Sequence, residues 1–486
     1  MEEKSVETAV HTRTSLSIGD RKLEYIDFLK SKRISVDPSG FEPTESNPKL
    51  FDWQNDIVRW ALVKGRACIF ADCGLGKTAM QLQWALQVAK HTNMPVLILA
   101  PLAVAQQTKR EGEKFGVHVN VCRTHQEVSE GVNITNYEMV THFDAEKFSG
   151  IVLDESSILK DYSSKTRQFL TEIFHDTPYK LCCTATPAPN DYKELGTHAQ
   201  FCNVMTQTEM LSTFFCHDGG NTSQWRLKGH AERKFFEWVA GWACCLTSPK
   251  DLGYNGDQFI LPELRIHEIT THSDDLVDSD GQMMLLAKAT QDLQERRQAR
   301  RSSLEARVNA ASEIANGTDD QVLVWCDLND ESAALADRIH GAVEVRGNQS
   351  PEYKESALSG FSSGKNRALI SKPSIAGWGM NWQQCSKMIF VGLSDSFESY
   401  YQAVRRCWRF GQEKPVDVYI VTSDAEGCVK DNIERKQRDA ERMTSELVRF
   451  TKDILSADLH HTVRMSEEYR AFERMEIPEW LLTELA

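Results

Sequence analysis

The sequence predicts an α/β protein with two parallel-sheet lobes in tandem, and two observations support this fold class. Short apolar runs alternate with longer helical patterns from about residue 51 to residue 200, and the alternation returns from about residue 311 to residue 425. Continuous apolar strands separated by helices are typical of βαβ units, whose parallel sheet is covered on both faces. The expected strands are Ala67–Phe70, Val96–Ala100, Val132–Thr135, Ile151–Leu153 and Leu181–Thr184 in the first lobe, and Val322–Trp325, Val343–Val345, Ala368–Ile370, Met388–Val391 and Val416–Val421 in the second.

The pattern changes before, between and after the two lobes. The first fifty residues are polar with one short helical pattern, and the central stretch is rich in aromatic and then in arginine residues. After about residue 425, apolar residues recur at helical spacing, and we expect this helix to pack back onto the second lobe. The expected units are an N-terminal extension (1–50), the first, ATP-binding lobe (51–200), an inserted or bridging, mostly helical region (201–310), the second lobe (311–425) and a C-terminal helical extension (426–486).

The central stretch allows more than one interpretation. Trp225, Trp238 and Trp242 are expected to lie in a core rather than to form a base-stacking platform. The arginine cluster at residues 296–301 could contact phosphates, brace the lobes or form a plain solvated helix. The cysteines and the histidine between residues 202 and 245 match no zinc spacing, so we expect no metal there.

The composition is that of a globular chain of 486 residues, with 41% hydrophobic and 26% charged residues. The longest apolar run, Val96–Ala105, is about half of the ~20 residues that a membrane span needs. The N-terminal residues lack a signal-peptide pattern. The thirteen cysteines include no C-x-x-C pair, which favours free thiols in a reducing compartment. We therefore expect a cytoplasmic protein with no membrane contact.

The net charge of −14 comes from 56 lysines and arginines against 70 aspartates and glutamates. An acidic total argues against a protein that coats nucleic acid with its whole surface. It leaves room for a local basic groove.

The strongest local signal is a glycine-rich turn, Ala71–Thr78, between an apolar strand and a helical pattern. Glycines let backbone N–H groups curl around phosphate oxygens, and the following helix adds its positive N-terminal end. In such a turn Lys77 reaches the β- and γ-phosphates, and the Thr78 hydroxyl binds Mg²⁺. The alternative is a plain turn followed by a lysine. The expected nucleotide contacts here are Gly74, Gly76, Lys77, Thr78 and Ala79.

A phosphate loop needs a second acidic site, and Ile151–Glu155 is an apolar strand that ends in two carboxylates. Asp154 would hold Mg²⁺ through water, together with Thr78, and Glu155 would polarise the water that attacks the γ-phosphate. An Asp-Glu pair after a strand is common by itself. Its position about eighty residues after the phosphate loop, in the same α/β block, supports its assignment as the acidic part of a nucleotide site.

The third element is the arginine-containing stretch Gln402–Gln412. Arg406 and Arg409 are three residues apart and share one face of a helix. Aimed at the phosphate site of the first lobe, they would act as arginine fingers, which raise phosphoryl-transfer rates by roughly 10³–10⁵. A solvated basic helix is the alternative for this stretch taken alone.

These three elements, in this order, resemble a superfamily II helicase or translocase, and more narrowly its Swi/Snf-type branch. The chain departs from that family at Ser157, where the family has histidine in Asp-Glu-x-His, and at Ala71, which replaces the usual first glycine. The other stretches that resemble family motifs are Phe51–Gln54 (the glutamine motif), Ala100–Val104 (Ia), Ile134–Glu138 (Ib), Thr184–Asn190 with Glu194–Leu195 (III), Ala376–Trp382 (V) and Gln402–Gln412 (VI).

The resemblance implies two RecA-like lobes that bind ATP and Mg²⁺ between them. It implies that Gln54 contacts the adenine base and that Gly379 contacts the nucleotide from the second lobe. The residues implied to touch nucleic acid are Pro101, Leu102, Thr135, Asn136, Tyr137, Lys372 and Asn381.

The expected function is that of a DNA-dependent ATPase, a translocase or helicase that moves along or remodels DNA, with duplex or branched DNA favoured over RNA. Two alternatives stay open: an ATP-gated DNA-binding module that recruits a nuclease or replication partner, and an RNA-directed helicase. The Asp154–Ser157 variant and the His217–His230 region are most similar to compact phage- or prophage-encoded helicases. That similarity implies the host cytoplasm and a role in DNA replication or recombination.

Overall fold

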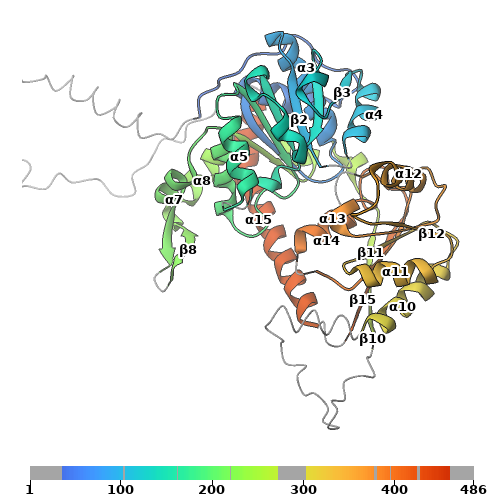
Figure 1. Ribbon diagram of the computed structural model, residues 1–486. Coiled ribbons are helices and arrows are strands. Elements are labelled where there is room, and N and C mark those ends of the chain that lie inside the picture. Colours follow the sequence, from blue (N-terminus) through green and yellow to red (C-terminus); the bar gives the residue numbers. More distant parts are fainter. Residues whose placement is uncertain are drawn as a thin grey trace, which may run out of the picture.

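The computed structural model describes residues 36–101, 104–160, 163–218, 221–271, 303–376, 380–394, 396–423 and 427–459. In the described residues, two parallel sheets flanked by helices form two lobes (Figure 1). The expected fold class, two tandem RecA-like α/β lobes, is confirmed. No helix in these ranges is long and apolar enough to cross a bilayer.

The first sheet has seven strands in the order β3-β4-β2-β5-β6-β1-β9, and every pairing within it is parallel. Its strands are β1 (Arg66–Ala71), β2 (Val96–Ala100), β3 (Val119–Val121), β4 (Val132–Asn136), β5 (Gly150–Asp154), β6 (Tyr179–Thr184) and β9 (Ala243–Leu246).

The second sheet has six strands in the order β10-β15-β14-β11-β13-β12, again all parallel. Its strands are β10 (Leu264–Thr271), β11 (Val322–Cys326), β12 (Ala342–Val345), β13 (Ala368–Ser371), β14 (Lys387–Val391) and β15 (Val416–Ser423).

Helices cover both faces of each sheet because successive side chains of a strand point to opposite faces. Ala67 and Ile69 of β1 join one hydrophobic core of the first lobe, and Cys68 and Phe70 join the other. The first core is covered by α2 (Asp52–Lys64), α3 (Lys77–Thr92) and α4 (Ala105–Phe115), and the second by α5 (Lys165–Ile173), α6 (Leu195–Phe201), α7 (Gln207–Phe214) and α8 (Glu232–Ala240). The second lobe repeats the plan with α10 (Leu304–Asn316) and α11 (Asn329–Arg338) on one face, and α12 (Pro351–Ser362), α13 (Pro373–Ala376) and α14 (Phe397–Val404) on the other.

The stretch expected to be a mostly helical bridge (201–310) contributes a strand to each sheet. β9 is the outermost strand of the first sheet beside β1, and β10 pairs with β15 in the second. A hairpin of β7 (Phe215–Asp218) and β8 (Asn221–Leu227) projects from the first lobe (Figure 1). β9 is too short for periodicity to separate a strand from a buried helix, and β10 lies at a sheet edge without a continuous apolar run.

Other expectations for the central stretch have mixed outcomes. Trp238 and Trp242 are buried in the first-lobe core, as expected, whereas Trp225 is half-buried and contacts the His217 ring of the hairpin at a tilted angle. The arginine cluster and the N-terminal helical pattern lie outside the described residues. All described cysteines are free thiols.

The C-terminal helix α15 (Gly427–Leu459) does not pack only on the second lobe, contrary to expectation. Ile433 enters the second-lobe core, whereas Met443 and Leu447 enter one first-lobe core and Leu455 enters the other. A helix of 33 residues is about 50 Å long, so it extends beyond one lobe. Figure 1 shows it running from the second lobe along the first.

The packing of α15 predicts that Leu447→Ala destabilises the protein by about 2–5 kcal/mol, because the substitution empties a site that is 3% exposed. Chemical denaturation measures the free energy of unfolding. Ser445→Ala, at an exposed position of the same helix, is the control and should change it by less than about 0.5 kcal/mol. Equal, small effects of both substitutions would mean that α15 does not dock on the first lobe.

Candidate active site at the boundary between the lobes

The phosphate loop lies between β1 and α3, at the carboxyl end of the first sheet, where open α/β sheets bind ligands. Gly74 and Gly76 have φ angles of +87° and +75°, which side chains other than glycine rarely adopt. A Cβ on Gly74 would also lie 2.8 Å from the backbone nitrogen of Phe410. The loop therefore touches the arginine-containing stretch of the second lobe directly.

Lys77 begins α3 and folds back over the phosphate loop. Its Nζ donates to the carbonyl oxygens of Ala71 at 2.8 Å and Asp72 at 3.3 Å. Both acceptors are neutral carbonyls, so phosphate oxygens would be stronger partners for the ammonium group. Thr78 and Ala79 follow in the first turn of the same helix, so all three residues lie at its N-terminal end.

The two carboxylates at the end of β5 are buried near the phosphate loop. Asp154 accepts a hydrogen bond from Gln81 of α3, with 2.7 Å between Nε2 and Oδ1. Burial raises the pKa of the Asp154 carboxyl, and burial likewise raises that of Glu155, while nearby Lys77 opposes both shifts. A cation beside these carboxyl groups would stabilise their ionised form and so offset the effect of burial.

Glu155 has two unusual features. Its φ of +53° is rare for a residue other than glycine, and its buried Oε2 has no hydrogen-bond partner in the described part of the chain. Such backbone strain and unsatisfied polar atoms cluster at functional sites. Thr78 and Asp154 offer a hydroxyl and a carboxylate oxygen, the kind of ligand that Mg²⁺ prefers, so these two residues fit that ion.

The second lobe contributes Arg406 and Arg409, and both guanidinium groups donate to the carbonyl oxygen of Met380 at 3.3 Å. Arg406 also donates to the side chain of Gln402 at 2.7 Å. Burial and the neighbouring charge of Arg406 lower the pKa of Arg409 to about 10, and Glu155 is among the groups that oppose this shift. The charges of Arg406 and Arg409 therefore interact with the carboxylate of Glu155 in the first lobe.

Gln54 lies beneath the phosphate loop. Its Nε2 donates to the Leu75 carbonyl at 3.1 Å, and its Oε1 accepts from the Phe51 N–H at 3.1 Å. The structure thus brings Gln54, Gly74, Gly76, Lys77, Thr78, Ala79, Asp154, Glu155, Arg406 and Arg409 into one region. Gly379 lies outside the described residues.

Four of the residues expected to touch nucleic acid are buried or hydrogen-bonded within the protein. Thr135 is buried, and the Tyr137 hydroxyl donates to the Asp154 carbonyl at 2.7 Å. The Asn136 side chain accepts from two backbone N–H groups of the helical turn that follows β4. Asn381 donates to Glu111 of α4 at 3.0 Å, across the lobe boundary.

The remaining nucleic-acid candidates are less constrained. Pro101 directly follows β2, and Lys372 directly follows β13, so both lie at the carboxyl ends of strands. Leu102 lies outside the described residues. Contact of any of the seven residues with nucleic acid stays a prediction.

Several contacts around the candidate site were not predicted from the sequence. Gln81 follows Lys77 by four residues on α3, so its helical spacing was an available signal. Asp72, Lys160, Glu398, Tyr401 and Arg405 join the two lobes, and local patterns carry no signal for such contacts.

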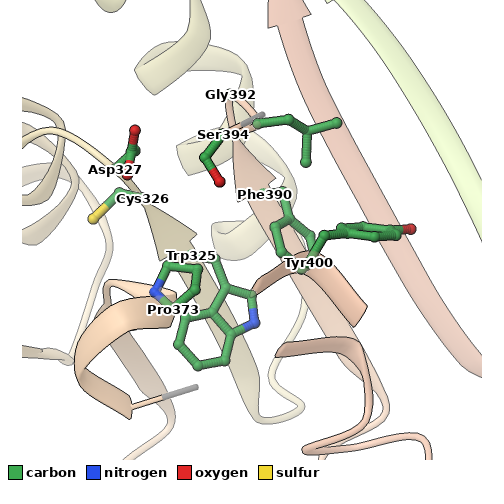
Figure 2. A pocket seen from close by; sticks show the side chains of 9 residues that line it. Trp325, Cys326, Asp327, Pro373, Phe390, Gly392, Ser394 and Tyr400 are labelled. Carbon is green, nitrogen blue, oxygen red and sulfur yellow. The ribbon is translucent and has the colours of Figure 1, made fainter. Parts of the chain in front are cut away.

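A small pocket in the second lobe contains none of the candidate site residues (Figure 2). It lies at the carboxyl ends of β11 and β14, with Trp325, Asp327 and Tyr400 among its lining residues. Its volume of about 20 Å³ has room for about one water molecule, so it is no nucleotide site.

Comparisons with known families agree with this two-lobe arrangement. Residues 50–215 match the SNF2-related domain, and residues 306–411 match the helicase conserved C-terminal domain, so the two matches together cover more than half of the chain. The chain belongs to the Swi/Snf-type branch of superfamily II. The first matched segment contains the phosphate loop and the Asp-Glu pair of this Swi/Snf-type protein, and the second ends within the arginine-containing stretch.

Two curated relatives illustrate the similarity. The Swi/Snf-type chain is 29% identical over 202 residues to chromodomain-helicase-DNA-binding protein 1-like of Danio rerio. The aligned region covers 35% of the chain and 19% of that protein. It is 28% identical over 183 residues to a Caenorhabditis elegans homologue of SWI/SNF-related matrix-associated actin-dependent regulator of chromatin subfamily A-like protein 1, covering 33% of the chain and 24% of that protein. The chain thus spans only about a fifth to a quarter of these relatives. These matches do not test the similarity to phage-encoded helicases, which stays a prediction.

A buried histidine supports the Asp-Glu strand and gives a pH prediction. The His198 Nε2 lies 3.2 Å from the Ser156 hydroxyl, and burial lowers the pKa of His198 to about 4. The folded state favours the neutral ring, so its stabilising contribution is complete above the unfolded pKa near 6.5 and is lost as the pH falls toward 4.

Denaturation of the Swi/Snf-type protein at several pH values checks this prediction. The difference in unfolding free energy between wild type and His198→Gln should change by about 2–3 kcal/mol between pH 7 and pH 4. His142→Gln, at an exposed position, should show no such change. A pH-independent difference for His198→Gln would contradict the assigned shift.

Proposed function

We propose that the protein is a DNA-dependent ATPase that uses ATP hydrolysis between its lobes to translocate along or remodel DNA. One observation supports the proposal: a lysine and two carboxylates of the first lobe lie close enough to two arginines of the second lobe for their charges to interact. Each half alone lacks part of what phosphoryl transfer requires.

The proposed roles follow from chemistry and position. Lys77 and the phosphate-loop N–H groups bind the β- and γ-phosphates, and Gln54 contacts the adenine base. Thr78 and Asp154 would hold Mg²⁺, and the ion would supply positive charge beside the phosphate oxygens. Glu155 positions the attacking water and takes its proton, while Arg406 and Arg409 stabilise the transferring group.

The proposed movement on DNA depends on the position of the ATP site between the two lobes. ATP between the lobes draws them together, and loss of the γ-phosphate contact lets them separate. Nucleic acid that lies across both lobes is then gripped alternately by each. The names of the relatives, one of which includes "helicase-DNA-binding", support DNA as the partner. A grip on phosphates is salt-dependent and independent of sequence.

The test is the ATPase rate with single-stranded DNA, duplex DNA, forked DNA and RNA as separate stimulants. We expect duplex or forked DNA to stimulate most. Turnover without any DNA stimulation would favour an ATP-gated binding module, and strongest stimulation by RNA would favour an RNA-directed enzyme. Triplex displacement beside forked-duplex unwinding then separates translocation on duplex DNA from strand separation.

A further inference from the structure

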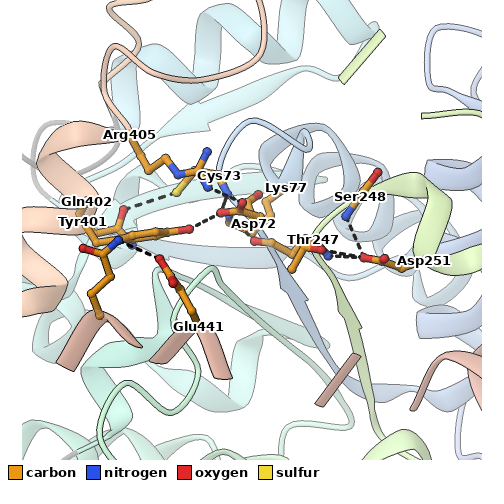
Figure 3. A network of polar contacts seen from close by, with 12 residues as sticks. Asp72, Cys73, Lys77, Thr247, Ser248, Asp251, Tyr401, Gln402, Arg405 and Glu441 are labelled. Atoms are coloured by element: carbon orange, nitrogen blue, oxygen red, sulfur yellow. Dashed lines mark hydrogen bonds and ion pairs between the residues drawn. The ribbon is translucent and has the colours of Figure 1, made fainter. Parts of the chain in front are cut away.

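Three arginines of the stretch Gln402–Gln412 have different partners. Arg406 and Arg409 donate to the carbonyl of Met380, within the second lobe. Arg405 instead crosses to the phosphate loop, where its Nη2 lies 2.6 Å from Oδ2 of Asp72 (Figure 3). Its guanidinium group also lies over the Trp408 ring, 4.5 Å from the centroid.

The Asp72 carboxylate is held by several donors at once. Oδ1 accepts from the Tyr401 hydroxyl and, at 2.6 Å, from the backbone N–H of Cys73, while Oδ2 pairs with Arg405. The side chains of Arg405 and Asp72 are only 10% and 18% exposed. A charge pair that is shielded from water and supported by further hydrogen bonds is costly to break from one side.

The other end of α14 also reaches the first lobe. Glu398 forms an ion pair with Lys160, which lies just after the Asp-Glu pair, and accepts from the Thr186 hydroxyl at 3.3 Å. Glu398, Tyr401 and Arg405 are three and four residues apart, so they share one face of the helical segment. One face of the second lobe thus contacts the phosphate loop, the segment after β5 and the segment after β6.

We propose that this face of α14 is a two-point clamp that positions the second lobe against the nucleotide-binding motifs of the first. Glu398 is the contact at one end of the helix, and Arg405, just beyond the other end, is the positioning residue. Arg405 is paired with a carboxylate, so it is not itself available to phosphates. By holding the phosphate loop beside the second lobe it places Arg406 and Arg409, which lack a carboxylate partner among the contacts described, where phosphates would bind. The inference rests on the proposed ATPase function.

Variants of the Arg405–Asp72 pair test the clamp. We expect Arg405→Gln and Asp72→Asn each to lower kcat for ATP hydrolysis by about 30-fold while KM for ATP changes by less than about threefold. The double variant should be no slower than either single variant, because both substitutions break one contact. Arg405→Lys should recover part of the rate because it restores the charge.

The matched control is Arg59→Gln, which breaks an exposed ion pair with Glu42 at 2.9 Å on the first lobe. It should leave kcat unchanged. Wild-type kcat in Arg405→Gln, a faster rate, or single effects that multiply in the double variant would overturn the clamp.

Hydrogen–deuterium exchange of the nucleotide-free protein tests the clamp independently of the proposed ATPase function. Residues 72–78 and 397–405 should exchange faster in Arg405→Gln than in wild type, and Arg59→Gln should not change them. Unchanged exchange in Arg405→Gln would overturn the clamp whether or not the protein hydrolyses ATP. A wild type that exchanges as expected but shows no DNA-stimulated ATPase activity would overturn only the proposed function.

Discussion

Arg409→Ala should slow ATP hydrolysis by about 10³–10⁵, while affinity for ATP falls far less. The Arg409 side chain is half-buried near Arg406, and its hydrogen bond goes to a neutral carbonyl rather than to a carboxylate. Its positive charge is therefore poorly compensated until charge builds on the transferring phosphoryl group. The effect should appear in the chemical step rather than in binding.

Single-turnover hydrolysis, beside the equilibrium binding of a fluorescent ATP analogue, separates these two quantities for Arg409→Ala. Arg338→Ala is the control, because Arg338 is a partly exposed arginine of the same lobe that pairs with Glu305 on α10. It should change neither quantity. If Arg409→Ala weakened binding and turnover in parallel, Arg409 would be a ground-state contact and not an arginine finger.

Glu155→Gln should lower ATP turnover by about 10²–10⁴ without unfolding the protein. The substitution keeps the shape of the side chain, but an amide cannot take a proton from the attacking water. The buried, unpartnered Oε2 of Glu155 is the atom expected to do so. Lys77→Ala should also abolish turnover, but with weaker ATP binding, because it removes a contact to the bound phosphates.

Steady-state turnover and circular dichroism check both substitutions, and Glu146→Gln at an exposed position should behave as wild type in each measurement. Normal turnover in either Glu155→Gln or Lys77→Ala would remove the site assignment. A lost fold in Glu155→Gln would show that the carboxylate is structural.

The chemistry-bearing motifs were accessible to sequence reasoning because phosphate binding needs particular residues at short, fixed spacings. The turn before α3, the carboxylates after β5 and the arginine-containing stretch each lie within a dozen residues, next to elements whose apolar runs reveal them. The motifs did not reveal that Thr135 is buried or that the Tyr137 hydroxyl donates to the Asp154 carbonyl. Both depend on how β4 and β5 pack, which a motif does not describe.

The order of apolar strands and helices, and the identities of the residues at strand ends, determined the two-lobe α/β class and the candidate nucleotide site of this Swi/Snf-type protein. Tertiary structure alone decided that Arg405 pairs with Asp72, 333 residues away, and that α15 spans both lobes. It also decided that β9 and β10 complete different sheets. The physical reason is range: turn and strand chemistry acts between near neighbours in the chain, whereas contacts between lobes depend on which folded surfaces meet.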